Sequence, residues 1–228
     1  MTCFTSFKRA LLAVNLAIPC IVFGAFSVQA ASDAATLENA TRGCIEGEAP
    51  ASGAKLTLPE ILAACQTAMD MSDAQTHGLY LFSRAEALLE HGTTAAHRAV
   101  AKKDLTELIA RGHSLAWAHE RRATLALQSK ELGPQLIDDL TKAIALREQP
   151  SKHGLKRQPP WRLYVLRAGA LLEMEHRDGG SDFSAAHADL DRALDLKPGQ
   201  KTALRLKQWI LSQENATGRV QRKTTEKG

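Results

Sequence analysis

The feature that most constrains the fold is a hexapeptide that recurs three times. It reads RAEALL at residues 84–89, RATLAL at 122–127 and RAGALL at 167–172. In each copy an arginine precedes an alanine, and apolar residues then follow three and four positions apart, which is typical of an amphipathic helix. Recurrence at intervals of 38 and 45 residues predicts a structural unit that is repeated along the chain.

Each copy is followed by a second helical segment with its own shared form. These segments read DLTELI at residues 104–109, DLTKAI at 139–144 and DLDRAL at 189–194, and ACQTAM at 64–69 resembles them. We therefore expect antiparallel helix pairs, with small residues where two helices cross closely and leucines between neighbouring pairs. One pair cannot bury its apolar face, whereas a stack of pairs can.

The rest of the chain also favours an all-α fold. Residues 57–60 read TLPE, a capping box with proline in the first turn of the helix that follows. No segment shows convincing strand alternation, and a hydrophobic content of 44% excludes a disordered chain. Later helices are punctuated by Gly92, Gly112, Gly133 and Pro198-Gly199.

The first thirty residues are typical of a secretory signal peptide. Lys8 and Arg9 precede an apolar stretch from 10 to 28, which ends in the small-residue sequence Val28-Gln29-Ala30. We predict cleavage after Ala30 and export to the periplasm. An uncleaved membrane anchor is the competing interpretation, which the polar Asn15 and Pro19 weaken. Lipid attachment at Cys20 is disfavoured by the proline before it.

Export would leave Cys44 and Cys65 as the cysteines of the mature chain. An oxidising compartment favours a disulfide between them. Two free thiols and a metal site are the alternatives, and no Cys-x-x-Cys or Cys/His spacing supports a metal.

The repeated segments resemble the tetratricopeptide repeat (TPR) family over roughly residues 57–215. In the last repeat the second-helix spacing is reproduced by Phe183, Ala186, Leu190, Ala193, Leu196 and the terminal Pro198. In the first complete repeat the first-helix spacing is reproduced by Arg84, Ala85, Ala87, Leu88 and Gly92. The Cys44…Cys65 opening also resembles exported TPR proteins of proteobacteria.

The resemblance implies a right-handed superhelical stack of antiparallel helix pairs, a TPR-like α-solenoid. The organisation we predict is a signal peptide at 1–30, an irregular lead segment at 31–56, the repeat domain at 57–215 and a disordered basic tail at 216–228. Residues 200–214 read as a closing helix, with Lys201, Lys207 and Gln208 as its candidate polar outer side.

The sequence carries no motif with a catalytic mechanism. It lacks His-Glu-x-x-His, Gly-x-Ser-x-Gly and a phosphate-binding glycine loop. Its histidines show no pairing at i and i+4, and its net charge of +4 is too small to argue for nucleic-acid binding. We therefore expect a protein that is not an enzyme and that binds no cofactor, metal or nucleic acid.

In the TPR family the first helix of each pair lines a concave groove that receives a peptide or a partner helix. With the arginines as register, the resemblance selects Phe82, Glu86, Glu90, Trp117, Glu120, Thr124, Gln128, Arg162 and Glu173. The aromatic residues would anchor a partner, and the glutamates would make the groove acidic. The alternatives are a core position for Trp117 and an ordinary solvated helix face for the glutamates.

We therefore predict an exported scaffold that binds a protein or peptide. Two other functions stay open at this stage. One is an envelope assembly adaptor held in the membrane by an uncleaved residue 10–30 segment. The other, which the sequence favours least, is a hydrolase or an enzyme accessory domain with an unfamiliar site.

Overall fold

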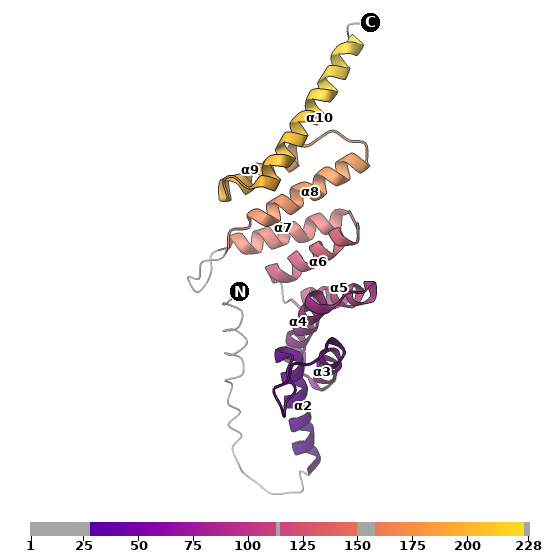
Figure 1. Ribbon diagram of the computed structural model, residues 1–228, viewed down its shortest axis with the longest axis vertical. Helices are drawn as coiled ribbons and strands as arrows, with labels where there is room; N and C mark the ends of the chain where they lie inside the picture. The colour runs from indigo at the N-terminus through magenta and orange to yellow at the C-terminus, as the bar shows by residue number, and fades with distance from the viewer. Residues whose placement is uncertain (1–27, 113–114, 150–157, 226–228) are drawn as a thin grey trace. The chain divides into compact units, whose positions relative to one another are not determined.

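The computed structural model describes residues 28–112, 115–149 and 158–225. Within these ranges the structure is helical, apart from connecting segments and an isolated antiparallel bridge between Glu48 and Lys55 (Figure 1). The helices are α2 (Val28–Glu46), α3 (Leu58–Met71), α4 (Ala74–His91), α5 (Ala95–Ala110), α6 (Ala116–Gln128), α7 (Pro134–Glu148), α8 (Trp161–Arg177), α9 (Ser184–Leu196) and α10 (Lys201–Thr225). The all-α prediction is confirmed for the part of the chain described.

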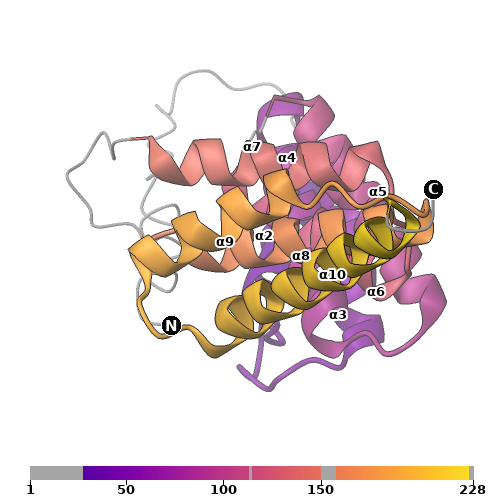
Figure 2. The same ribbon diagram turned by 90° about the horizontal axis from the view of Figure 1, so that it is seen from above.

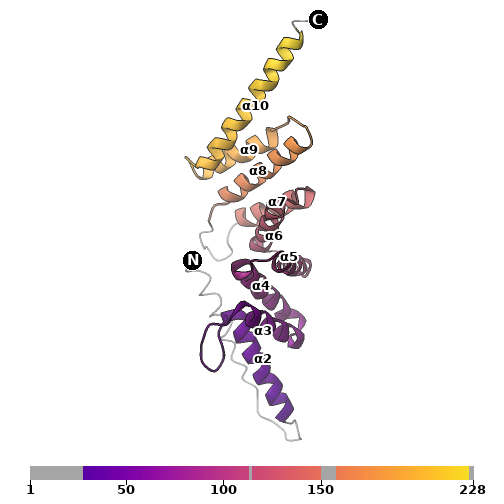
Figure 3. The same cartoon turned by 45° about the vertical axis from the view of Figure 1, so that its right-hand side comes forward.

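The helices fall into two compact units, residues 1–104 and 105–228, with the boundary inside α5. In the first unit α2 packs on α3, and both pack on α4 (Figure 3). In the second unit each helix from α6 to α10 packs on the next one, and α10 also touches α8 (Figure 2). Consecutive antiparallel helices thus pack side by side, as the repeated motifs predict.

The helix ends follow from local sequence. The backbone N–H of Thr57 donates to the Glu60 carboxylate at 2.7 Å, which completes the predicted capping box of α3. The carboxylate of Asp73 accepts from the backbone N–H groups of Gln75 and Thr76 and so caps α4. Gly112 follows α5 with a φ of +81°, a conformation that favours glycine.

The core of the second unit has alanines where helices cross and leucines between them. Ala123 of α6, Ala143 of α7, Ala168 of α8 and Ala193 of α9 are fully buried. Larger buried side chains, including Leu140 and Leu190, fill the space around them. Fully burying one leucine contributes about 2 kcal/mol, so the apolar seams supply most of the unit's stability.

In the first unit a disulfide joins α2 to α3 through Cys44 and Cys65, the pair that the sequence predicts. The helices also approach closely at this point. A Cβ placed on Gly43 would lie 2.9 Å from the Cβ of Ala64. Glycine is therefore required at residue 43 by the contact between the two helices.

Two predicted segments differ from the structure. Residues 31–46 belong to α2 and are not irregular, because small residues such as Ala40 and Cys44 provide its buried face against α3. Residues 216–225 continue α10 instead of forming a disordered tail. An existing helix extends at little cost, since each added residue gains a backbone hydrogen bond, and no proline interrupts this stretch.

The predicted signal peptide lies almost entirely outside the described residues, so the structure bears on neither its cleavage nor the anchor alternative. Among the helices that are described, none is long and apolar enough to cross a membrane.

Candidate functional site

An arginine–aspartate ion pair joins the two motifs in each of the three repeats. Each guanidinium donates through Nε and Nη2 to the two oxygens of one carboxylate, at 2.7–2.8 Å. The pairs are Arg84 with Asp104, Arg122 with Asp139, and Arg167 with Asp189. The arginines that mark the sequence repeat therefore have equivalent surroundings in the structure.

The remaining nitrogen of each arginine, Nη1, reaches the preceding second helix. In each case the acceptor is the third residue of the second motif in that preceding helix. Arg84 donates to Gln66 at 2.8 Å, Arg122 to Thr106 at 3.2 Å, and Arg167 to Thr141 at 2.8 Å. Each arginine thus connects its own pair of helices to the one before it. We call these three arginines, with their aspartates and acceptors, the ion-pair ladder.

The ladder is largely buried. The Asp139 side chain is 2% exposed and that of Arg122 is 13% exposed. In the last rung, the hydrogen bonds that Arg167 donates to the Asp189 carboxylate raise the pKa of Arg167 above its ordinary value. Removing one partner of such a pair costs about 3–5 kcal/mol, because the other charge is left buried without compensation. The ladder therefore fixes which faces of successive helices meet.

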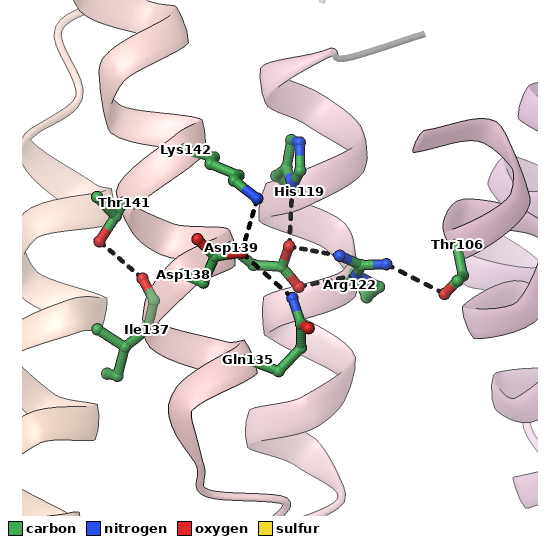
Figure 4. Close-up of polar contacts among 9 residues, drawn as sticks. All are labelled: Thr106, His119, Arg122, Gln135, Ile137, Asp138, Asp139, Thr141 and Lys142. Atoms are coloured by element: carbon green, nitrogen blue, oxygen red, sulfur yellow. Dashed lines mark hydrogen bonds and ion pairs between the residues drawn. The ribbon is translucent and has the colours of Figure 1, made fainter. Parts of the chain in front are cut away.

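The middle rung contains a buried histidine (Figure 4). The Nδ1 atom of His119 lies 2.8 Å from Oδ1 of Asp139, which also accepts from Arg122. An ionised carboxylate can only accept, so the imidazole is the donor in this contact. His119, Arg122 and Asp139 form a buried hydrogen-bond network that joins α6 to α7, and its members hold the two helices together.

The α2–α3 pair is held together differently. Ala64 occupies the position that aspartate holds in α5, α7 and α9, and Cys65 occupies the position of Leu105, Leu140 and Leu190. The disulfide and the close approach at Gly43 thus join helices that have no ladder carboxylate.

The predicted groove residues of the first unit lie on α4. Phe82 and Glu86 are half-buried, and Glu90 is exposed near the end of the helix.

The predicted residues of the second unit lie on α6 and α8. Those on α6 are half-buried Trp117, Glu120 and Thr124 and exposed Gln128. Arg162 and Glu173 are exposed on α8. None of the predicted groove residues in either unit is fully buried.

One of the glutamates predicted to make the groove acidic has a partner within the chain. Glu120 forms an ion pair with Arg147 of α7 at 2.5 Å, so its charge is compensated within the chain. The guanidinium of Arg121 lies 5.9 Å from the centre of the Trp117 ring and places an exposed cation beside it. With Arg162 on α8, the surface of the second unit has mixed charge.

Sequence reasoning missed the ladder aspartates and Arg147. The aspartates were visible as the shared first residue of the second motifs at 104–109, 139–144 and 189–194. Arg147 gave no such signal, because it belongs to no repeated motif. Among the residues described, no group of histidine, cysteine, aspartate and glutamate side chains is arranged to hold a metal ion.

Comparison with known proteins adds no assignment. Neither the family models nor the curated proteins searched give a match to this chain.

Proposed function

We propose that this chain is an exported TPR-like scaffold that binds a protein or peptide partner through the exposed sides of its first helices. The observation that carries the proposal is the equivalence of Arg84, Arg122 and Arg167, each of which has the same contacts in three successive repeats. Repeated helix pairs build extended surfaces that serve for recognition. A right-handed superhelix with the first helices on its concave side belongs to the same proposal.

The distribution of ionisable groups supports binding rather than catalysis. The buried carboxylates of Asp104, Asp139 and Asp189 accept hydrogen bonds from arginines of the same chain. Catalytic carboxylates must instead face a substrate within hydrogen-bond reach. The first helices keep Glu90, Gln128, Arg162 and Glu173 exposed, and these side chains are available to a partner.

The contacts that the first-helix side chains make within the chain indicate which residue types a partner should carry. Because Arg147 compensates Glu120, we assign acidic recognition to Glu90 of α4 and Glu173 of α8. Trp117 of α6, with Arg121 beside it, suits an apolar side chain next to an acidic group. For the second unit taken alone, we therefore propose a partner segment with an apolar residue for Trp117, an acidic residue for Arg121 and a basic residue for Glu173.

Peptide-array binding to the purified chain tests this proposal. Glu90→Gln and Glu173→Gln should weaken binding of basic peptides about 3- to 10-fold each, while Glu120→Gln should have a smaller effect. Asp138→Asn on the second helix α7 is the matched control, since it also removes one exposed carboxylate. Equal binding by all four variants would contradict first-helix recognition.

Export is part of the proposal and has its own test. The N-terminal apolar stretch and the Cys44–Cys65 disulfide support it. Mass spectrometry of the mature chain should find an N-terminus at residue 31. A chain that begins at residue 1 would favour the alternative of a membrane-anchored adaptor.

A further inference from the structure

Helix α10 follows the α8–α9 pair and has the register of a first helix in one further pair. Lys207 hydrogen-bonds with Asp191 of α9, just as the ladder arginines bond with Gln66, Thr106 and Thr141. Asp191 holds the same motif position in α9 as those acceptors do in their own helices. The Lys207 ammonium lowers the pKa of Asp191 from its ordinary value, chiefly through this hydrogen bond.

Burial supports this register on the side of α10 that faces the preceding pair. The residue four positions before the ladder arginine is buried in α4, α6 and α8, and its counterpart in α10 is the buried Ala203. The residue three positions after Lys207 is Ile210, which is fully buried, and its counterparts in α6 and α8 are buried too. The counterparts of Ala203 are Tyr80, Ala118 and Leu163, and those of Ile210 are Leu125 and Ala170.

The opposite side of α10 is exposed where other first helices are covered. Leu204, three positions before Lys207, is 43% exposed, whereas its counterparts Leu81, His119 and Tyr164 are buried. Gln208 is exposed at the position where Ala85, Ala123 and Ala168 are fully buried. Leu211 is 48% exposed, whereas its counterparts are buried or half-buried. We call Leu204, Gln208 and Leu211 the open face of α10.

The charges around the open face specify what can cover it. In the three complete repeats the basic residue of the first helix holds a carboxylate of the second helix, as well as its link to the preceding pair. Lys207 makes its link through an ion pair with Asp191, and its ammonium has further donors for a second carboxylate. The second helix that would supply this carboxylate is not among the described residues. Lys201 and Arg205 are exposed on the same helix and add positive charge.

We infer that the open face of α10 binds an amphipathic helix of a partner protein, which docks as the second helix of a pair with α10. The partner helix carries a carboxylate toward Lys207, a leucine directly after it and small residues at the crossing, as α7 and α9 do. This surface differs from the first-helix surface proposed above and does not depend on it. It continues the same series of pair interfaces that the chain already contains.

The chain's own second-helix sequence provides a direct probe. A fluorescent peptide of residues 182–197, added to the full-length chain, should bind, with anisotropy as the readout. Leu204→Ala and Leu211→Ala should each weaken its binding about 10-fold, since each removes apolar area that the peptide covers. Leu115→Ala is the matched control and should leave binding unchanged, because Leu115 is 46% exposed outside the open face.

Two further variants distinguish pairing from nonspecific adhesion. Gln208→Ala should tighten binding about 5-fold, because it restores the small residue found at this position in the complete pairs. A peptide with Asp189→Asn should bind about 10-fold more weakly, because it lacks the carboxylate.

Three results of the peptide experiment would overturn the inference. They are absence of peptide binding, weaker binding by Gln208→Ala, and an equal loss with Leu115→Ala. A dimer of the chain that Leu204→Ala and Leu211→Ala abolish would also overturn it, since the occupant would then be a second copy. Circular dichroism confirms that each variant remains folded, as is expected for substitutions at exposed positions.

Discussion

Removal of the Asp139 carboxylate should destabilise the chain far more than removal of its neighbour in sequence. Asp139 is 2% exposed and accepts three charge-assisted hydrogen bonds, two from Arg122 and one from His119. Asp138 is 47% exposed and pairs with Lys142 one turn along the same helix (Figure 4). The substitutions Asp139→Asn and Asp138→Asn therefore make the same chemical change in two different environments.

The structure sets the expected magnitudes. Breaking a buried pair costs about 3–5 kcal/mol, and an asparagine retains one acceptor oxygen, so we expect Asp139→Asn to lower the free energy of unfolding by about 3 kcal/mol. An exposed i,i+4 pair contributes about 0.3–0.5 kcal/mol, so Asp138→Asn should change the free energy by less than about 0.5 kcal/mol.

Urea unfolding followed by circular dichroism at 222 nm measures both values. The slope of each transition shows whether unfolding remains cooperative. This check is needed because repeat proteins can unfold in parts. Losses that are equal within about 0.5 kcal/mol would refute the argument that burial of the ladder fixes the helix pairs.

Three other predictions concern local features. Reduction of the Cys44–Cys65 disulfide should lower the unfolding free energy by about 3 kcal/mol, given the 21-residue separation, and an unchanged urea midpoint under strong reductant would contradict this. Gly43→Ala should cost about 1–3 kcal/mol through overlap with α3, whereas Gly169→Ala, whose Cβ meets open space inside α8, should stabilise by about 0.5–1 kcal/mol. If the melting temperatures of these two alanine variants shift in the same direction, the packing described is contradicted. The backbone N–H of Thr76 is the main cause that lowers the pKa of Asp73, so this cap stabilises the fold above the unfolded-state pKa and loses its effect as pH falls through the lower folded value. Stability measured from pH 6 to pH 2 should therefore fall less steeply for Asp73→Asn than for the parent chain, and identical slopes would exclude the cap's contribution.

The pairing of helices could be predicted from sequence because the two motifs recur with their own helical periodicity. The ion pairs of the ladder could not be predicted, although the arginine and the aspartate of each pair belong to these motifs. The arginine and its aspartate are 20, 17 and 22 residues apart in the three repeats. This variation comes from the connecting segments and hides the pairing from any fixed-spacing motif. Only the packing of the helices shows that the two motifs face each other.

The two ends of the fold were harder to predict for a different reason. Helix α2 buries small residues such as Ala40 and Cys44, and these give a weaker periodic signal than leucines do. The candidate binding residues lie on α4, α6 and α8, and the sequence did not show that Arg147 compensates Glu120. Long-range ion pairs of this kind depend on side chains outside the repeated motifs.

Double-mutant cycles at the three rungs of the ladder test the central claim most directly. Arg84 with Asp104, Arg122 with Asp139, and Arg167 with Asp189 should each show a coupling energy of about 1–3 kcal/mol, because residues in one buried ion pair do not contribute additively. Similar coupling at all three rungs would support one helix-pair unit repeated along the chain. Coupling below about 0.5 kcal/mol at any rung would mean that the repeats in the sequence do not occupy equivalent places in the folded protein.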